Sequence, residues 1–340
     1  MKILYDYSLL AHNTFGIEAK CRRYIEFDND DEAQSAARLL TCDGSSKSLY
    51  IIIGGGSNLL LTGDYEGSVV RSAVRGIEPL ADGAIRCGSG EAWDDVVAWC
   101  VAHNLCGAEN LSLIPGDVGA SAVQNIGAYG VEISDLVVKV EAVEIATGRL
   151  VSFSNADCCY GYRDSRFKHD WRNAYLITHV TYQLTPASRH PELHTHYGNI
   201  AAELERRGIE QPTPAQLRQV VIDIRQAKLP DPGVMGNAGS FFMNPIVNRK
   251  KYCELAARYA EMPHYTVDAD HEKIPAGWMI EQCGWKGRSM GRAGVYPRQA
   301  LVLVNLGGAT GREIVALSDA IRRDVRTRFG IDIHPEVNIV

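Results

Sequence analysis

Two glycine-rich segments contain the residue types that bind an anion through the backbone. The first, Gly54-Gly55-Gly56-Ser57-Asn58, directly follows the β-branched run of residues 49–53. Consecutive glycines let a ligand approach closely and let several N–H groups point at one anion. The segment is not a Walker loop, because no G-K-[ST] follows it, and Leu59 stands where a Rossmann fingerprint has its third glycine. Taken alone, it is either a tight turn or a phosphate cradle.

The second segment is longer and has almost no large side chains. It reads IPGDVGAS over residues 114–121 and continues as QNIGAYG over residues 124–130. An ordered loop of this length inside a compact domain is usually functional, and the alternative is an irregular surface connection. Together the two segments predict an extended dinucleotide whose pyrophosphate lies on backbone amides rather than at a helix N-terminus.

Three polar side chains stand in settings that allow chemistry. Arg163 lies in GYRDS, where its planar guanidinium could clamp a carboxylate or form a surface ion pair with Asp164. Ser240 stands between small residues and two phenylalanines, so it is either a hydroxyl in a pocket or a turn-forming serine. Glu336 follows Pro335 near the C-terminus, where the alternative to a functional acid is a charge that protects an edge strand.

The elements that must position these residues do not alternate strictly. Strands are predicted over residues 24–27, 49–53, 68–74, 84–88, 175–184 and 300–306, a hairpin over 137–145 and 149–153, and helices over 30–40 and 92–103. Capping boxes at residues 213–216 (TPAQ) and 310–313 (TGRE) open two more helices, and Gly330 ends the second. The fold class is therefore α+β.

Bulk composition excludes several classes of protein. At 340 residues the chain should form two or three domains, and its net charge of −6 disfavours nucleic acid or an anionic membrane as the main partner. No apolar run reaches the roughly 18–20 residues of a membrane span, and Asp6 breaks the brief apolar run near the N-terminus, so a signal peptide is not expected. The nine cysteines form no C-x-x-C pair, so we expect reduced thiols, no metal site and a cytoplasmic protein.

Beyond these patterns, the chain resembles the UDP-N-acetylenolpyruvoylglucosamine reductase family, whose FAD domain belongs to the vanillyl-alcohol oxidase (PCMH) superfamily. The resemblance rests on both glycine segments and on further motifs that follow in the family's order: NTFG at 13–16, GYRDS at 161–165, KLPDP at 228–232, GNAGSFF at 236–242, AGWMI at 276–280, QAL at 299–301 and PEV at 335–337. The chain departs from the family pattern at Asp117 and Ala120, both within the second glycine segment.

The resemblance implies an architecture. It predicts a two-lobed FAD-binding domain of the PCMH type, with lobes at residues 1–67 and 68–212, and a smaller α+β substrate-binding domain at residues 213–330. Residues 331–340 are expected to form a C-terminal strand that returns to the active site. The chain is similar to the variety of the family that closes a tyrosine-bearing loop over the substrate, which places Tyr197 on a loop of residues 186–212.

The resemblance also implies a reaction. It predicts NADPH-dependent reduction of UDP-N-acetylglucosamine enolpyruvate to UDP-N-acetylmuramate through noncovalently bound FAD, in cytoplasmic peptidoglycan precursor synthesis. The enzyme is expected to be a monomer with no nucleic-acid or membrane partner. One alternative is another FAD-dependent oxidase or dehydrogenase of the same superfamily. The other is a non-catalytic sugar-nucleotide-binding protein, which would leave Arg163, Ser240 and Glu336 without a role.

Site residues follow from the same resemblance. It assigns Arg163 to the substrate carboxylate, Ser240 to proton donation and Glu336 to the developing enolate. It assigns substrate binding to Tyr162, Tyr197, Arg225, Lys228, Asn244 and Gln299, although Arg225 also falls on the solvated face of its predicted helix. It assigns FAD binding to Gly54, Gly55, Gly56, Ser57, Asn58, Pro115, Gly116, Val118, Gly119, Ser121, Asn125, Ile126, Gly127, Ala128, Tyr129 and Gly130.

Overall fold

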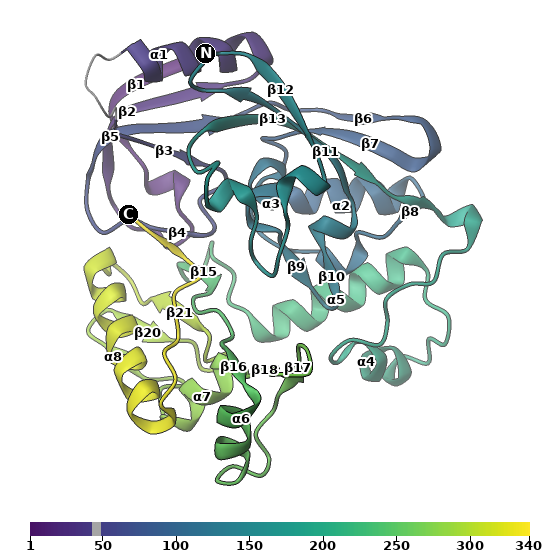
Figure 1. Cartoon of the computed structure of the whole chain (residues 1–340), viewed down its shortest axis with the longest axis vertical. Coiled ribbons are helices and arrows are strands. Elements are labelled where there is room, and N and C mark those ends of the chain that lie inside the picture. The colour runs from purple at the N-terminus through teal and green to yellow at the C-terminus, as the bar shows by residue number, and fades with distance from the viewer. Residues whose placement is uncertain (43–48) are drawn as a thin grey trace. The chain divides into compact units, whose positions relative to one another are not determined.

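The computed structural model describes residues 1–42 and 49–340. The chain forms two compact units, each assembled from separate stretches of sequence (Figure 1). The first unit comprises Met1–Tyr7, Cys21–Gly55 and Glu66–Ala227, and the second comprises Ser8–Lys20, Gly56–Tyr65 and Lys228–Val340. Both contain helices and sheets, so the predicted α+β class with two domains is confirmed.

The first unit begins with a four-stranded sheet in the order β1-β2-β5-β3. Its strands are β1 (Lys2–Ser8), β2 (Lys20–Phe27), β5 (Tyr65–Ser72) and β3 (Tyr50–Ile53). β3 runs parallel to β5 and places Ile53, the last residue before the first glycine segment, opposite Arg71. Helix α1 (Asp30–Cys42) has three acidic residues in its first turn, where they favour the helix dipole. It packs alanine and leucine side chains against buried residues of β2 and β5.

A five-stranded antiparallel sheet forms the rest of the core of this unit, in the order β12-β11-β13-β7-β6. Its strands are β12 (Leu150–Ser154), β11 (Val137–Glu144), β13 (Tyr175–Gln183), β7 (Ala84–Gly88) and β6 (Ile77–Pro79). β11 and β12 form the predicted hairpin. Helices α2 (Trp93–Ala102) and α3 (Val118–Gln124) cover one face of this sheet (Figure 1) and bury Trp93, Val97, Val118 and Ala122 there.

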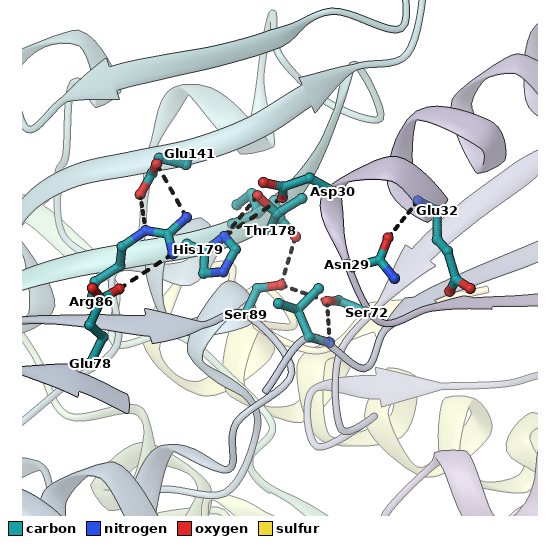
Figure 2. A network of polar contacts seen from close by, with 12 residues as sticks. Asn29, Asp30, Glu32, Ser72, Glu78, Arg86, Ser89, Glu141, Thr178 and His179 are labelled. Atoms are coloured by element: carbon teal, nitrogen blue, oxygen red, sulfur yellow. Dashed lines mark hydrogen bonds and ion pairs between the residues drawn. The ribbon is translucent and has the colours of Figure 1, made fainter. Parts of the chain in front are cut away.

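A polar network joins this sheet to its neighbours (Figure 2). Arg86 on β7 donates from Nε to Oε2 of Glu141 on β11 at 2.8 Å, and His179 Nδ1 lies 3.7 Å from Oδ1 of Asp30 at the start of α1. Burial lowers the pKa of His179, and the nearby charge of Arg86 lowers it further. Ser89, just after β7, donates to the carbonyl of Ile177 at 2.7 Å. The network thereby fixes the loop against which α3 packs.

Two further helices, α4 (Ile200–Arg206) and α5 (Pro214–Lys228), complete the first unit. The predicted capping box at the start of α5 is present, since the Thr213 N–H donates to Oε1 of Gln216 and the Gln216 N–H donates to the Thr213 hydroxyl. α5 buries four aliphatic side chains against α4, and Arg218 on α5 forms an ion pair with Asp94 on α2 at 2.7 Å. These contacts place α5 up to Ala227 in the first unit, whereas the sequence-based division begins the substrate-binding domain at residue 213.

The second unit contains three small sheets, with strand orders β15-β21-β20-β19, β16-β18-β17 and β22-β4. Their strands are β15 (Asn237–Ser240), β21 (Val302–Asn305), β20 (Ala293–Val295), β19 (Ser289–Met290), β16 (Ile246–Asn248), β18 (His271–Lys273), β17 (Tyr265–Thr266), β22 (Asn338–Ile339) and β4 (Leu59–Leu60). Helices α6 (Arg249–Ala256), α7 (Ala276–Gln282) and α8 (Gly311–Phe329) pack around them.

α8 bears out its sequence signals. Thr310 and Glu313 form the predicted capping box, and Gly330 ends the helix in the left-handed conformation with φ of 64°. The apolar stripe of the helix is buried, including Ile314, Leu317 and Ile321. Across residues 1–42 and 49–340, none of the helices combines the length and apolar character needed to span a membrane.

Candidate active site

Gly54 and Gly55 of the first glycine segment lie against the second segment inside the first unit. A Cβ added to Gly54 would lie 3.0 Å from Cβ of Ala120, and one added to Gly55 would lie 3.4 Å from Cα of Gly116. Side chains at residues 54 and 55 would therefore fill the space between the loops. Close approach of two bare backbones provides N–H donors around a phosphate-sized group, so these residues fit the pyrophosphate of a dinucleotide.

The sequence predicted that the whole second segment is a loop. This prediction is wrong for residues 118–124, which form α3. Small side chains allow this helix to pack closely: a Cβ on Gly119 would lie 3.0 Å from Cβ of Ser89. The N–H groups of Val118 and Gly119 donate to the carbonyls of Glu91 and Ser89 at 2.9 and 2.8 Å. The small side chains of residues 118–122, which the sequence assigns to a long functional loop, thus allow α3 to pack tightly at the end of β7.

Asp117, the departure from the family pattern, lies directly against the first segment. A Cβ on Gly55 would be 3.1 Å from Oδ1 of Asp117, and Oδ2 is 3.5 Å from Nη2 of Arg71. Arg71 also pairs with Oε2 of Glu26 at 3.2 Å, and its buried Nε has no hydrogen-bond partner in the described part of the chain. Burial raises the pKa of the Asp117 carboxyl, although the charge of Arg71 acts in the opposite direction.

Residues 125–130 of the second segment are held by their own network. Asn125 adopts the left-handed conformation and donates from Nδ2 to Oε2 of Glu132 at 2.8 Å and to the Gly161 carbonyl at 2.7 Å. The short strands β9 (Gly127–Ala128) and β10 (Val131–Glu132) pair antiparallel. The Tyr129 hydroxyl interacts with Arg225, and burial lowers the pKa of this arginine. Arg225 is thus partly buried against the predicted cofactor segment instead of lying on a solvated helix face.

Arg163, which follows this segment in the chain, donates hydrogen bonds back to it. Its Nη2 donates to the Gly127 carbonyl, and Nη1 donates to the Asn125 carbonyl at 3.4 Å. A Cβ on Gly127 would lie 2.8 Å from Nη1, so the guanidinium occupies the space that a side chain there would need. Asp164, the alternative partner for Arg163, pairs with His169 at 2.8 Å, whereas Nη1 of Arg163 lies 4.0 Å from Oε1 of Glu132. Tyr162 lies beside the guanidinium, 5.3 Å from Cζ to the ring centroid.

Tyr197 also lies beside the cofactor segment. Cδ2 of its ring is 3.3 Å from where a Cβ on Gly130 would lie, and a Cβ on Gly198 would lie 3.9 Å from Cδ1 of Tyr129. Tyr197 is 45% exposed. The first unit therefore brings together Tyr129, Arg163, Tyr197 and Arg225 around residues 125–130.

The second unit brings together Ser240 and Glu336. Ser240 ends β15 opposite Val302, and the Glu336 N–H donates to the carbonyl of Phe241 at 2.8 Å. Phe241 and Phe242 are buried, whereas Ser240 is exposed, so the hydroxyl stands at the edge of an aromatic core. Asn58 donates from Nδ2 to the Glu336 carbonyl at 3.3 Å and thereby joins the end of the first glycine segment to the same place.

The other residues predicted in the second unit have mixed environments. Asn244 accepts the N–H of Ala276 at 2.9 Å through Oδ1 and so holds the start of α7. Gln299 packs against the same helix, since a Cβ on Gly277 would be 3.2 Å from its Oε1. Lys228 is exposed at the end of α5. The NTFG motif contacts the strand that carries Ser240, because the Thr14 hydroxyl donates to the carbonyl of Asn237, the first residue of β15, at 2.6 Å.

Comparison with known proteins connects this geometry to a family. Residues 23–154 match the FAD binding domain family, and residues 231–340 match the C-terminal domain of UDP-N-acetylenolpyruvoylglucosamine reductase. The reductase of that name from Bacteroides fragilis strain YCH46 is 51% identical over 338 residues, which cover 98% of this chain and 99% of that protein. This chain belongs to the UDP-N-acetylenolpyruvoylglucosamine reductase family. The reductases from Flavobacterium johnsoniae and Burkholderia pseudomallei strain K96243 are 43% and 45% identical over 344 and 343 residues, covering 100% and 99% of this chain and 100% and 96% of those proteins.

The fold is shared at much lower sequence identity. The crystal structure of UDP-N-acetylenolpyruvylglucosamine reductase from Thermus caldophilus superimposes with a TM-score of 0.68 at 19% identity, covering 99% of this chain and 98% of that one. The backbone arrangement that presents the two glycine segments is therefore compatible with very different sequences of this reductase family.

Some residues around the candidate site were not predicted from sequence. Arg71 and Asn110 contact the second glycine segment, at Asp117 and Tyr129, but neither stands in a pattern that indicates a ligand. Arg71 becomes relevant only because β3 and β5 pair in parallel, which brings it beside the loop that follows Ile53. Pairing register of this kind is a tertiary property, and no local spacing reveals it.

Proposed function

We propose that Arg163, Ser240 and Glu336 carry the chemistry of this enzyme. As a member of its family, the chain is an FAD-containing, NADPH-dependent oxidoreductase that reduces UDP-N-acetylglucosamine enolpyruvate to UDP-N-acetylmuramate, a step of peptidoglycan synthesis. The two glycine segments would hold the flavin pyrophosphate on backbone amides. When bound, the flavin relays a hydride from NADPH to the double bond of the enolpyruvyl ether.

Hydride addition to this substrate builds negative charge on its carboxylate and α-carbon. A group that binds this charge more strongly in the transition state than in the ground state accelerates the step. Arg163 suits this role because its guanidinium cannot lose its proton and can pair with a carboxylate through two parallel hydrogen bonds. The observation that carries the proposal is that this guanidinium donates hydrogen bonds to the carbonyls of Asn125 and Gly127, which belong to the segment predicted to bind FAD.

Ser240 would then donate the proton that the α-carbon needs. Ser240 is exposed, and the two phenylalanines that follow it are buried. This setting suits a proton donor that must reach a bound ligand. Glu336 would act on the same proton transfer, and its N–H donates to the carbonyl of Phe241, the residue after Ser240. The substrate would be oriented by Tyr162, Tyr197, Arg225, Lys228, Asn244 and Gln299.

The proposal also covers the setting of the enzyme. We place it in the cytoplasm as a monomer whose partners are the UDP-amino sugar and NADPH. In support, the eight cysteines of residues 1–40 and 49–340 are free thiols, and five of them are buried, as is typical of a reducing compartment. Light scattering should give a mass close to 37.3 kDa for a monomer.

The half-reactions of a Ser240→Ala variant test the mechanism. Reduction of the flavin by NADPH needs no proton from Ser240, so bleaching should stay near the wild-type rate. Anaerobic reoxidation by the enolpyruvyl substrate should slow by more than about 10²-fold, because general acid catalysis is worth about 10²–10⁴. Ser240→Cys should recover part of the rate, since a thiol is a stronger acid than an alcohol.

Ser289→Ala, at an exposed position of β19, is the matched control and should leave both half-reactions unchanged. Unchanged reoxidation in Ser240→Ala would remove this serine from proton transfer. Two results would favour the alternative functions instead: rapid reoxidation of reduced flavin by air without the enolpyruvyl substrate indicates an oxidase, and a colourless protein without flavin indicates a sugar-nucleotide-binding protein.

A further inference from the structure

Asn110 is a buried side chain that the proposed mechanism does not use. It lies in a single turn of 3₁₀-helix, Glu109–Leu111, between α2 and the second glycine segment, and only 2% of its surface is exposed. Its Nδ2 donates to the carbonyl of Tyr129 at 2.9 Å and to the carbonyl of His194 at 2.8 Å. One amide group thus uses both of its N–H donors on two backbone segments that are 65 residues apart in sequence.

The two segments that Asn110 joins are the ones that carry the proposed substrate residues of the first unit. Tyr129 belongs to residues 125–130, where Arg163 and Arg225 converge. His194 lies three residues before Tyr197, on the loop of residues 186–212. The ring of Tyr197 packs against Gly130, next to the carbonyl that Asn110 holds. A bond from Asn110 to His194 therefore fixes the base of the stretch that carries Tyr197.

The turn that carries Asn110 is a firm support. The indole N–H of Trp93, a core residue of α2, donates to the Leu111 carbonyl at 2.9 Å. Glu109 accepts the Gly107 N–H at 2.8 Å and is itself almost fully buried. Burial raises the pKa of the Glu109 carboxyl, and His194 is among the groups whose charge acts against this rise. Of these two adjacent buried residues, Asn110 is the one that bonds directly to the tyrosine-bearing loop, at the His194 carbonyl.

We propose that Asn110 is a positioning residue for the UDP-sugar, which holds the part of the loop of residues 186–212 at His194 to residues 125–130 and so fixes the base from which Tyr197 closes over the substrate. The inference rests on the proposed function of Tyr197. Fixing the base of the loop in advance lowers the entropy lost when the loop closes, so the benefit appears as substrate affinity. Loss of the bond should leave chemistry after binding unchanged.

The variant Asn110→Leu tests this, because leucine has a similar volume and donates no hydrogen bond. The His194 carbonyl would then lose its donor, and the base of the loop would no longer be fixed. We expect KM for UDP-N-acetylglucosamine enolpyruvate to rise about tenfold, with kcat within about twofold of wild type. Trypsin should also cleave faster after Arg189, which is exposed on the same loop.

Asn155→Leu is the matched control. Asn155 also donates from Nδ2 to two backbone carbonyls, those of Ser134 and Val137 at 2.7 and 2.8 Å, but neither belongs to the loop or to residues 125–130. Both variants should lose thermal stability to a similar degree, whereas only Asn110→Leu should change KM and cleavage after Arg189. FAD affinity should stay similar in both, because the pairing of β9 with β10 still holds residues 127–132.

Two outcomes overturn the inference: an unchanged KM in Asn110→Leu, or equal changes of KM and cleavage in Asn110→Leu and Asn155→Leu. Combining Asn110→Leu with Tyr197→Ala gives a further check, because the two effects on KM should not add if Asn110 acts through Tyr197. Failure of the proposed function is seen separately, since wild-type protein would then show no flavin reoxidation by the enolpyruvyl substrate.

Discussion

Individual side chains of the site are held mainly by backbone carbonyls. Arg163 and Asn110 both donate to carbonyls of residues 125–130, and Asn125 donates to the carbonyl of Gly161. A carbonyl is fixed by the secondary structure around it, so these contacts set the position of a guanidinium or amide more firmly than a flexible carboxylate would. At Arg163, whose guanidinium is the proposed carboxylate ligand, a small change of donor geometry should therefore affect turnover.

Arg163→Lys should lower turnover although it keeps the positive charge. An ammonium group cannot reach two carbonyls and a substrate carboxylate with the planar geometry of a guanidinium. We expect kcat to fall about 10²–10³-fold, the scale of one oxyanion-stabilising donor, with flavin reduction by NADPH unchanged. Arg166→Lys is the control, since Arg166 pairs with the exposed Asp170. Near-normal turnover of the Arg163 variant would exclude this residue from the mechanism.

Asp117→Asn should stabilise the protein in a pH-dependent way. Burial raises the pKa of Asp117 in the folded state, so its favourable contribution is complete below the usual carboxyl pKa of about 4 and is lost as pH rises through the raised value. The variant should therefore unfold at a higher temperature than wild type at pH 8 but not at pH 4. Thermal unfolding followed by circular dichroism over this range measures the difference.

Asp94→Asn provides the opposite case for the same measurement. Burial acts to raise the pKa of Asp94, but the hydrogen bonds from Arg218 and the Leu113 N–H outweigh it and leave the pKa lowered. The stability that Asp94 contributes is present above the usual carboxyl pKa and is lost as pH falls through the lowered value. Its asparagine variant should thus be less stable than wild type at pH 8. Parallel pH trends in the two variants would contradict the assignment.

At the scale of secondary structure, the elements with local end signals were predictable. The capping boxes at Thr213 and Thr310 mark the starts of α5 and α8 through bonds between neighbours in sequence, and Gly330 marks the end of α8. Helix α3 was missed because its start lacks such a signal: Asp117 stands at the N-cap position but makes no capping bond. Its helical state follows from packing on the five-stranded sheet, which no local pattern specifies.

The residues of the candidate site show the same contrast between local sequence signals and tertiary packing. Motif spacing led to Arg163, Ser240 and Tyr197 through a family resemblance, but the support of each residue depends on segments far apart in sequence. Asn110 reaches His194 only because the turn after α2 and the loop of residues 186–212 pack together. The environment of Arg225 shows the limit most plainly, since helical periodicity placed it in solvent and tertiary packing against Tyr129 buries it.

Gly311→Ala tests how closely an element of the second unit must pack. A Cβ on Gly311, the first residue of α8, would lie 1.8 Å from the carbonyl oxygen of Leu61, so the helix start would have to move. Overpacking of this kind costs about 1–3 kcal/mol, and the variant should unfold at a lower temperature. Gly63→Ala is the control, because no atom lies within 4 Å of a Cβ there. Equal unfolding temperatures for the two variants would disprove the close contact.

At the scale of the whole molecule, each unit is built from interleaved stretches of the chain. The polypeptide passes from the first unit to the second between Gly55 and Gly56, within the first glycine segment, and returns at residue 66. Glycine at both positions permits the local backbone that each unit requires: Gly54 and Gly55 lie against Asp117 and Ala120, and a Cβ on Gly56 would overlap the carbonyl of His12. The segment thus serves chain connection as well as the proposed cofactor contact.

Bound FAD should accordingly stabilise the folded chain without a covalent link. A ligand that binds only the folded state at 100 times its dissociation constant contributes about 2.7 kcal/mol, so the unfolding temperature should rise with added FAD. Gly55→Ala should reduce this rise, because its Cβ would lie 3.1 Å from Oδ1 of Asp117 and occupy the cradle. Acid precipitation should release the yellow chromophore into the supernatant. Colour that stays with the precipitate would show a covalent bond, and an unfolding temperature independent of FAD would argue against the cradle.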